Sequence, residues 1–130
     1  MIIPTALVID DDSVVREFIR LHLEALGWDV REANSAASGL ILFRQQRPQL
    51  VTLDLLMSSD DLCASLSLAT LLKAEAPDVA ILVITALASD EKIQSFMSTH
   101  HIELYDKSFK DPYLSAVFAR LNVFNTFSAP

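Results

Sequence analysis

Five short hydrophobic runs recur along the chain, and longer segments with helical spacing separate them. The runs cover residues 6–9, 28–30, 50–53, 79–84 and 102–105. The first, third and fourth are continuous and rich in β-branched residues, which is typical of parallel strands covered on both faces. The second is short and polar, and it predicts a strand at the edge of a sheet.

Five helices are predicted after these strands, over residues 14–26, 35–46, 62–76, 90–99 and 112–122. Ser13 is a candidate N-cap of the first helix, and Gly27 is a stop signal at its end. Asp111 and Pro112 form a start signal for the last helix. Because strand and helix alternate five times, we predict an α/β fold: a doubly wound, five-stranded parallel sheet with helices on both faces.

The length and composition indicate one folded domain. The chain has 130 residues, of which 52% are hydrophobic, and we place the domain at residues 1–122, with 123–130 as a C-terminal extension or the start of a linker. The net charge of −7 argues against nucleic acid as a direct partner. No apolar run reaches the roughly 18 residues of a membrane span, and the lone Cys63 excludes an internal disulfide. We therefore expect a cytoplasmic domain that does not bind membranes.

Polar residues follow the predicted strands at their carboxyl ends, where doubly wound folds bind ligands. These residues are Asp10, Asp11, Asp54, Thr85 and Lys107. If the strand order is the flavodoxin-like 2-1-3-4-5, the first and third strands are neighbours, and the acids that follow them converge. Two carboxylates about 4 Å apart repel by roughly 4 kcal/mol at an effective dielectric near 20. Either some of these acids are protonated or a cation lies among them. An oxygen-only site suits Mg²⁺, and one carboxylate could then accept a phosphoryl group that a lysine and a hydroxyl neutralise.

Four segments at these strand ends stand in a characteristic order: VIDDDSVVR at 8–16, LDLLM at 53–57, VITA at 83–86 and YDKSF at 105–109. In this order they resemble the receiver domain of response regulators in two-component signalling. The resemblance covers about residues 5–122. It implies a domain that a histidine kinase or a histidine phosphotransfer protein phosphorylates with Mg²⁺ as cofactor, and that catalyses only its own phosphorylation and dephosphorylation.

The same resemblance implies a role for each strand-end residue. Asp54 would be the phospho-acceptor, Thr85 the switch hydroxyl and Lys107 the partner of the phosphoryl group. The metal ion would be held by Asp10, Asp11, Asp54 and the backbone carbonyl of Leu56. Leu56 and Leu87 would overhang the phosphoryl site, and because apolar side chains cannot orient an attacking water, we predict slow self-dephosphorylation.

The chain departs from the family pattern around this site. Ser58 stands where the family has a proline, and Leu62 where it has the glycine that opens the third helix. Ser108 replaces the proline that normally follows the lysine, and Leu104 replaces the aromatic switch residue. These changes leave the acids in place. They alter positions through which the family couples phosphorylation to a conformational change.

Two alternative functions account for parts of the pattern. A degenerate receiver that binds a protein without phosphorylation agrees with the missing proline, glycine and aromatic residue, but all the chemical residues are retained. A haloacid-dehalogenase-like phosphatase would use Asp10-x-Asp12-x-Val14 as its nucleophile motif. That enzyme needs a further acidic pair after the lysine, where only Asp111 follows, and it leaves Asp54 unexplained.

The remaining interpretations concern surfaces and caps. A partner, or a second copy of the chain, is expected to bind the face formed by helix 90–99, strand 102–105 and helix 112–122. Its candidate side chains, at least half of them expected in the core, are Phe96, Met97, Tyr105, Phe109 and Phe118. We interpret Asp12 as a helix cap, Asp60 and Asp61 as caps of the third helix, and Cys63 as a small buried side chain.

Overall fold

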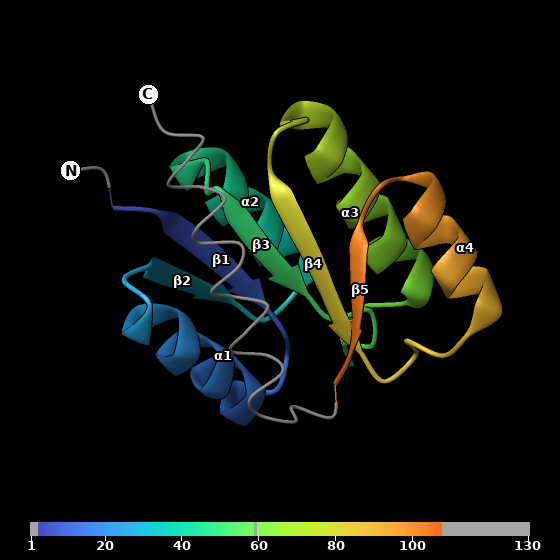
Figure 1. The fold of residues 1–130 in the computed structure, drawn as a ribbon, viewed down its shortest axis with the longest axis horizontal. Helices are drawn as coiled ribbons and strands as arrows, with labels where there is room; N and C mark the ends of the chain where they lie inside the picture. The colour runs from blue at the N-terminus through green and yellow to red at the C-terminus, as the bar shows by residue number, and fades with distance from the viewer. Residues whose placement is uncertain (1–2, 59, 108–130) are drawn as a thin grey trace.

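Five parallel strands form one sheet in the computed structural model, which describes residues 3–58 and 60–107. The strands are β1 (Thr5–Ile9), β2 (Asp29–Ala33), β3 (Leu50–Leu53), β4 (Ala80–Thr85) and β5 (Glu103–Asp106). Their order is β2-β1-β3-β4-β5, as the sequence predicts. Because all the strands are parallel, their carboxyl ends lie along the same edge of the sheet (Figure 1).

The described helices are α1 (Ser13–Ala25), α2 (Ala36–Gln46), α3 (Leu62–Glu75) and α4 (Glu91–Thr99). Helix α1 packs on one face of the sheet, and α2, α3 and α4 pack on the other (Figure 1). The helix predicted at 112–122 and the extension at 123–130 lie outside the described residues. No helix within the described ranges is long and apolar enough to cross a membrane.

Strand side chains alternate between two hydrophobic clusters, one on each face of the sheet. Leu7 and Ile9 join the cluster under α2, α3 and α4, whereas Ala6 and Val8 join the cluster under α1. This alternation follows from the two-residue period of a strand. Both faces of the central strands are buried, which explains why their sequences read as continuous hydrophobic runs.

Helix α2 approaches β1 closely at Gly39. A Cβ atom at this position would lie 2.6 Å from Cδ1 of Ile9, which is nearer than atoms in ordinary contact. Gly39 and Ile9 are both buried, so an additional methyl group here requires the end of the Ile9 side chain to move within the core. This contact sets the distance between α2 and the end of β1 that carries the acidic residues.

The predictions of Ser13 as an N-cap and of Cys63 as a buried side chain are wrong. The N-cap of α1 is Asp12, whose carboxylate accepts hydrogen bonds from the backbone N–H groups of Val14 and Val15, and Ser13 is the first residue of the helix. Cys63 is exposed, because it falls off the stripe of α3 that faces the core. That stripe contains Ser65, Leu68, Ala69 and Leu72.

Candidate functional site

The first and third strands bring Asp10 and Asp54 together. Strands β1 and β3 are neighbours, and their last residues, Ile9 and Leu53, are partners in the register. The chain continues this pairing beyond the strands, since the N–H of Asp54 donates to the carbonyl of Ile9 across 3.1 Å. Asp10 and Asp54 therefore stand side by side at the end of the sheet, and each is only 2% exposed.

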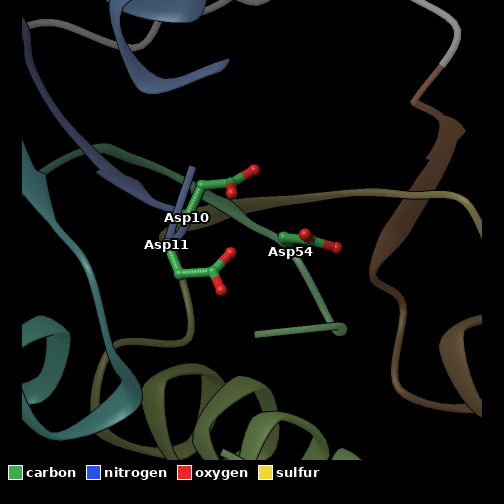
Figure 2. A group of neighbouring side chains, drawn as sticks. All are labelled: Asp10, Asp11 and Asp54. Atoms are coloured by element: carbon green, nitrogen blue, oxygen red, sulfur yellow. The ribbon is translucent and has the colours of Figure 1, made fainter. Parts of the chain in front are cut away.

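Asp11 completes a cluster of three carboxyl groups. One carboxylate oxygen from each of Asp10, Asp11 and Asp54 lies within 4.8 Å of the others. Figure 2 shows the side chains of Asp10 and Asp11 extending toward the side on which Asp54 lies. The convergence predicted from the strand order is thus confirmed by the geometry.

Lys107 lies within contact distance of two of these acids. Its Nζ atom is 2.6 Å from Oδ2 of Asp54 and 3.1 Å from Oδ2 of Asp10. The backbone N–H of Lys107 donates to the carbonyl of Thr85 across 3.1 Å, which aligns the end of β5 with the end of β4. Burial alone would lower the pKa of Lys107, but the hydrogen bonds and charges of Asp54 and Asp10 outweigh it and raise the pKa above its ordinary 10.5.

The cluster retains negative charge that Lys107 does not compensate. Three carboxylates face one ammonium group, which leaves two formal negative charges when all the acids are ionised. Burial raises the pKa of Asp10 above its ordinary 3.8, and the nearby charge of Asp54 adds to this effect. An oxygen-only set of ligands with excess negative charge fits a hard divalent cation such as Mg²⁺.

Asp11 differs from the other two acids in its hydrogen bonding. Its Oδ2 accepts a hydrogen bond of 2.7 Å from the backbone N–H of Ser58, and this N–H lowers the pKa of Asp11 below its ordinary 3.8. The sequence alone does not predict this contact, because the two residues are 47 positions apart. The available signal was the replacement of proline by Ser58, because any residue other than proline supplies a backbone N–H.

Two residues beyond each of Asp54 and Thr85, a leucine contacts the site through its backbone. The N–H of Leu56 donates to Oδ1 of Asp54 across 3.2 Å, and the N–H of Leu87 donates to the hydroxyl of Thr85 across 3.3 Å. Leu56 is 48% exposed, whereas Thr85 is fully buried. The structure therefore brings the predicted residues to one edge of the sheet, with the Thr85 hydroxyl oriented by a local N–H.

The other acidic residues near the site act as helix caps. Asp61 caps α3 by accepting from the N–H of Ala64, as predicted. Asp60 does not cap α3, because its Oδ2 accepts a hydrogen bond of 2.8 Å from the N–H of Ala36 at the start of α2. A cap can be supplied from a distant loop as readily as from the preceding residue, and sequence proximity does not reveal which helix it serves.

Comparison with known proteins identifies the family. Residues 6–119 match the response regulator receiver domain, and the chain belongs to this family. Receiver domains bind Mg²⁺ through an acidic pocket and are phosphorylated by histidine kinases, and a three-aspartate cluster of that kind is present here. The chain is thus a receiver domain of two-component signal transduction, a class not generally made up of catalytic enzymes, and this membership argues against the phosphatase alternative.

Two curated relatives are transcriptional regulators by name. The DNA-binding dual master transcriptional regulator RpaA of Synechocystis sp. is 33% identical over 99 residues, which cover 73% of this chain and 39% of that protein. The probable transcriptional regulatory protein TcrX of Mycobacterium tuberculosis is 32% identical over 82 residues, which cover 63% of this chain and 34% of the relative. The chain therefore spans little more than a third of the length of these relatives.

Solved structures share the fold along nearly the whole chain. A CheY-like response regulator receiver domain protein from Methanospirillum hungatei JF-1 aligns with a TM-score of 0.85 and 17% identity, covering 98% of this chain and 100% of that one. The receiver domain of NtrX from Brucella abortus aligns with a TM-score of 0.78 and 26% identity, covering 91% and 98%. These similarities support the strand order and helix arrangement described above.

Proposed function

We propose that the chain accepts a phosphoryl group on Asp54 from the phosphohistidine of a histidine kinase or a histidine phosphotransfer protein. A carboxylate oxygen of Asp54 forms the new bond to phosphorus, and the bond between phosphorus and the histidine nitrogen breaks. The observation that carries the proposal is the position of Lys107, whose Nζ bridges Asp54 and Asp10 at 2.6 and 3.1 Å. This lysine supplies a fixed positive charge beside the oxygen that would receive the phosphoryl group.

The other strand-end residues have complementary roles in this proposal. Mg²⁺ would be held by Asp10, Asp11, Asp54 and the backbone carbonyl of Leu56, and when bound it neutralises charge on the phosphoryl oxygens. Lys107 remains close enough to Asp54 to pair with those oxygens. The Thr85 hydroxyl accepts from the N–H of Leu87 and has a proton to donate to a phosphoryl oxygen.

Phosphorylation would then alter a surface that other proteins recognise. We propose that this surface includes α4 and β5, where Phe96 and Tyr105 are partly exposed, while Met97 is buried in the core. Phe109 and Phe118, the other two candidates, lie outside the described residues. A second copy of the chain could pair through the same surface, whereas the net charge of −7 disfavours direct binding of nucleic acid by this domain.

We also propose that the domain is not a turnover enzyme and that it works in the cytoplasm. Its chemistry would be limited to gaining and losing its own phosphoryl group, because the proposed acceptor is a residue of the protein itself. The exposed free thiol of Cys63 is compatible with a reducing compartment.

The proposal is tested by incubating the protein with Mg²⁺ and acetyl phosphate and recording its intact mass. We expect one phosphoryl adduct in the parent protein and none in Asp54→Ala. Asp78→Ala is a matched control, since Asp78 is an exposed acid outside the carboxylate cluster, and it should be labelled like the parent. If the parent gains no adduct under conditions that label a known receiver, the phosphorylation-independent binding module becomes the better interpretation.

A further inference from the structure

The loop after β3 contains a backbone donor that contacts one of the clustered acids. The N–H of Ser58 donates to Oδ2 of Asp11 across 2.7 Å, although 47 residues separate the two along the chain. Ser58 is exposed and Asp11 is partly buried, so the bond lies at the rim of the carboxylate cluster. Each of Asp10 and Asp54 instead accepts from an N–H two residues further along its own segment.

The loop that carries this N–H is fixed on both sides. Before Ser58, the side chain of Met57 is buried in the hydrophobic core. After it, the N–H of Asp60 donates to the carbonyl of Met57 across 3.0 Å, and the Asp60 carboxylate accepts from the N–H of Ala36 across 2.8 Å. The direction of the Ser58 N–H is therefore set by contacts with the core and with α2.

We propose that the backbone N–H of Ser58 is a positioning group for the Asp11 carboxylate. By holding Oδ2, it leaves Oδ1 to face a divalent cation beside Asp10 and Asp54. A carboxylate at the rim of a site otherwise loses rotational freedom when it binds a metal ion, and an existing hydrogen bond removes part of that cost. This inference rests on the proposed Mg²⁺ site and assigns to this chain's own loop a role in forming it.

The residue type at position 58 makes the argument specific. A proline here would have no N–H to donate, so it could not hold Asp11 in this way. The serine that departs from the family pattern thus supplies a contact that the family's own residue cannot make. The altered loop would thus help to orient one of the retained acids, Asp11, in the carboxylate cluster.

The decisive comparison is between Ser58→Pro, which removes the N–H, and Ser58→Ala, which retains it. Mg²⁺ is titrated into each protein, and the amide NMR shifts of residues around Asp54 give the dissociation constant. We expect Ser58→Pro to raise this constant about tenfold, the lower end of what loss of a group that orients a metal ligand costs. Ser58→Ala loses the hydroxyl, which also acts on Asp11, but retains the N–H, so it should lose clearly less Mg²⁺ affinity than Ser58→Pro.

Two controls separate positioning from a general disturbance of the loop. In an Asp11→Ala background, Ser58→Pro should cause no further loss of Mg²⁺ affinity, because the carboxylate it acts through is absent. In the parent protein, the Ser58 amide should exchange slowly with solvent, and saturating Mg²⁺ should preserve that protection. This second measurement needs no variant and does not depend on the folding of Ser58→Pro.

Three results would overturn the inference. One is an unchanged Mg²⁺ dissociation constant in a folded Ser58→Pro protein, and another is an equal loss of affinity in the Asp11→Ala background. The third is loss of Ser58 amide protection on adding Mg²⁺, which would show that the metal ion and the N–H compete for Asp11. If the parent itself shows no saturable response to Mg²⁺, the proposed metal site fails, and the inference fails with it.

Discussion

Lys107 donates a hydrogen bond from Nζ to Oδ2 of Asp54 across 2.6 Å, although the two residues are 53 positions apart in the chain. The same ammonium group lies 3.1 Å from Oδ2 of Asp10. Two buried carboxylates thus share one internal cation, which lowers the cost of keeping them ionised side by side. This arrangement leads to expectations for stability that can be measured on the unphosphorylated protein.

Replacing Lys107 by methionine should destabilise the protein in the absence of divalent cations. Lys107→Met retains most of the apolar stem but leaves Asp10 and Asp54 without their ammonium partner. We expect the free energy of unfolding at neutral pH to fall by about 2 kcal/mol, measured by urea denaturation with EDTA present. The control is Lys92→Met on the exposed part of α4, which should change stability little. Equal stabilities for the two variants would contradict the shared-cation interpretation.

Replacing Asp10 by asparagine should stabilise the metal-free protein at neutral pH. Burial raises the pKa of Asp10, so the folded state favours the protonated form, and its contribution to stability is lost as the pH rises through the folded pKa. Asp10→Asn should therefore be more stable than the parent by about 1 kcal/mol at pH 7. This difference should shrink as the pH falls toward the ordinary value of 3.8.

The same denaturation series can be run with Asp29→Asn as a control. Asp29 is an exposed acid on β2, outside the carboxylate cluster. A stabilisation by Asp10→Asn that does not vary with pH would mean that the carboxylate charge is not its cause. A loss of stability at pH 7 would mean that the contact with Lys107 outweighs the cost of burial.

The phosphorylated protein should lose its phosphoryl group slowly. Leu56 follows Asp54 by two residues and is 48% exposed. In the proposed receiver site its apolar side chain would overhang the phosphoryl group and could not orient an attacking water. We expect Leu56→Asn to accelerate dephosphorylation about tenfold, equivalent to roughly 1.4 kcal/mol of activation free energy. The decay of the adduct mass over time gives the rate. The control is Leu71→Asn, at an exposed position of α3, which should leave the rate unchanged. A half-life of seconds in the parent protein would refute the expectation of slow dephosphorylation.

Adding a methyl group at Gly39 should push α2 away from β1. The new Cβ of Gly39→Ala would lie 2.6 Å from Cδ1 of Ile9. Overpacking of this kind costs about 1–3 kcal/mol, against a gain in helix propensity of about 0.5–1 kcal/mol. We therefore expect a net loss of stability in urea denaturation. Ile9→Val removes Cδ1 and leaves Cγ1 at 3.2 Å, so Gly39→Ala should become clearly less destabilising in that background. Simple additivity of the two changes would contradict the contact.

Much of the fold follows from local patterns in the sequence. Continuous hydrophobic runs mark β1, β3 and β4, and their regular alternation with helices implies a parallel sheet. A parallel sheet brings all carboxyl ends to one edge, and in the flavodoxin-like order the first and third strands are neighbours, so Asp10 and Asp54 are expected to meet. The residues that follow each strand, together with the order of the strands, therefore predict which side chains form the site.

The sequence by itself determined the hydrophobic strands, their alternation with helices and the acids at their ends, because hydrophobic periodicity and chain direction are properties of the residues. The order of the strands in the sheet followed from the resemblance to receiver domains, and the structure has that order. Only the tertiary structure decided which partner each acid has. The N–H of Ser58 on Asp11 and the Asp60 carboxylate at the start of α2 depend on how a loop folds back over the sheet. A backbone N–H is common to every residue except proline, so its direction leaves no mark on the sequence and becomes defined only when the chain is packed.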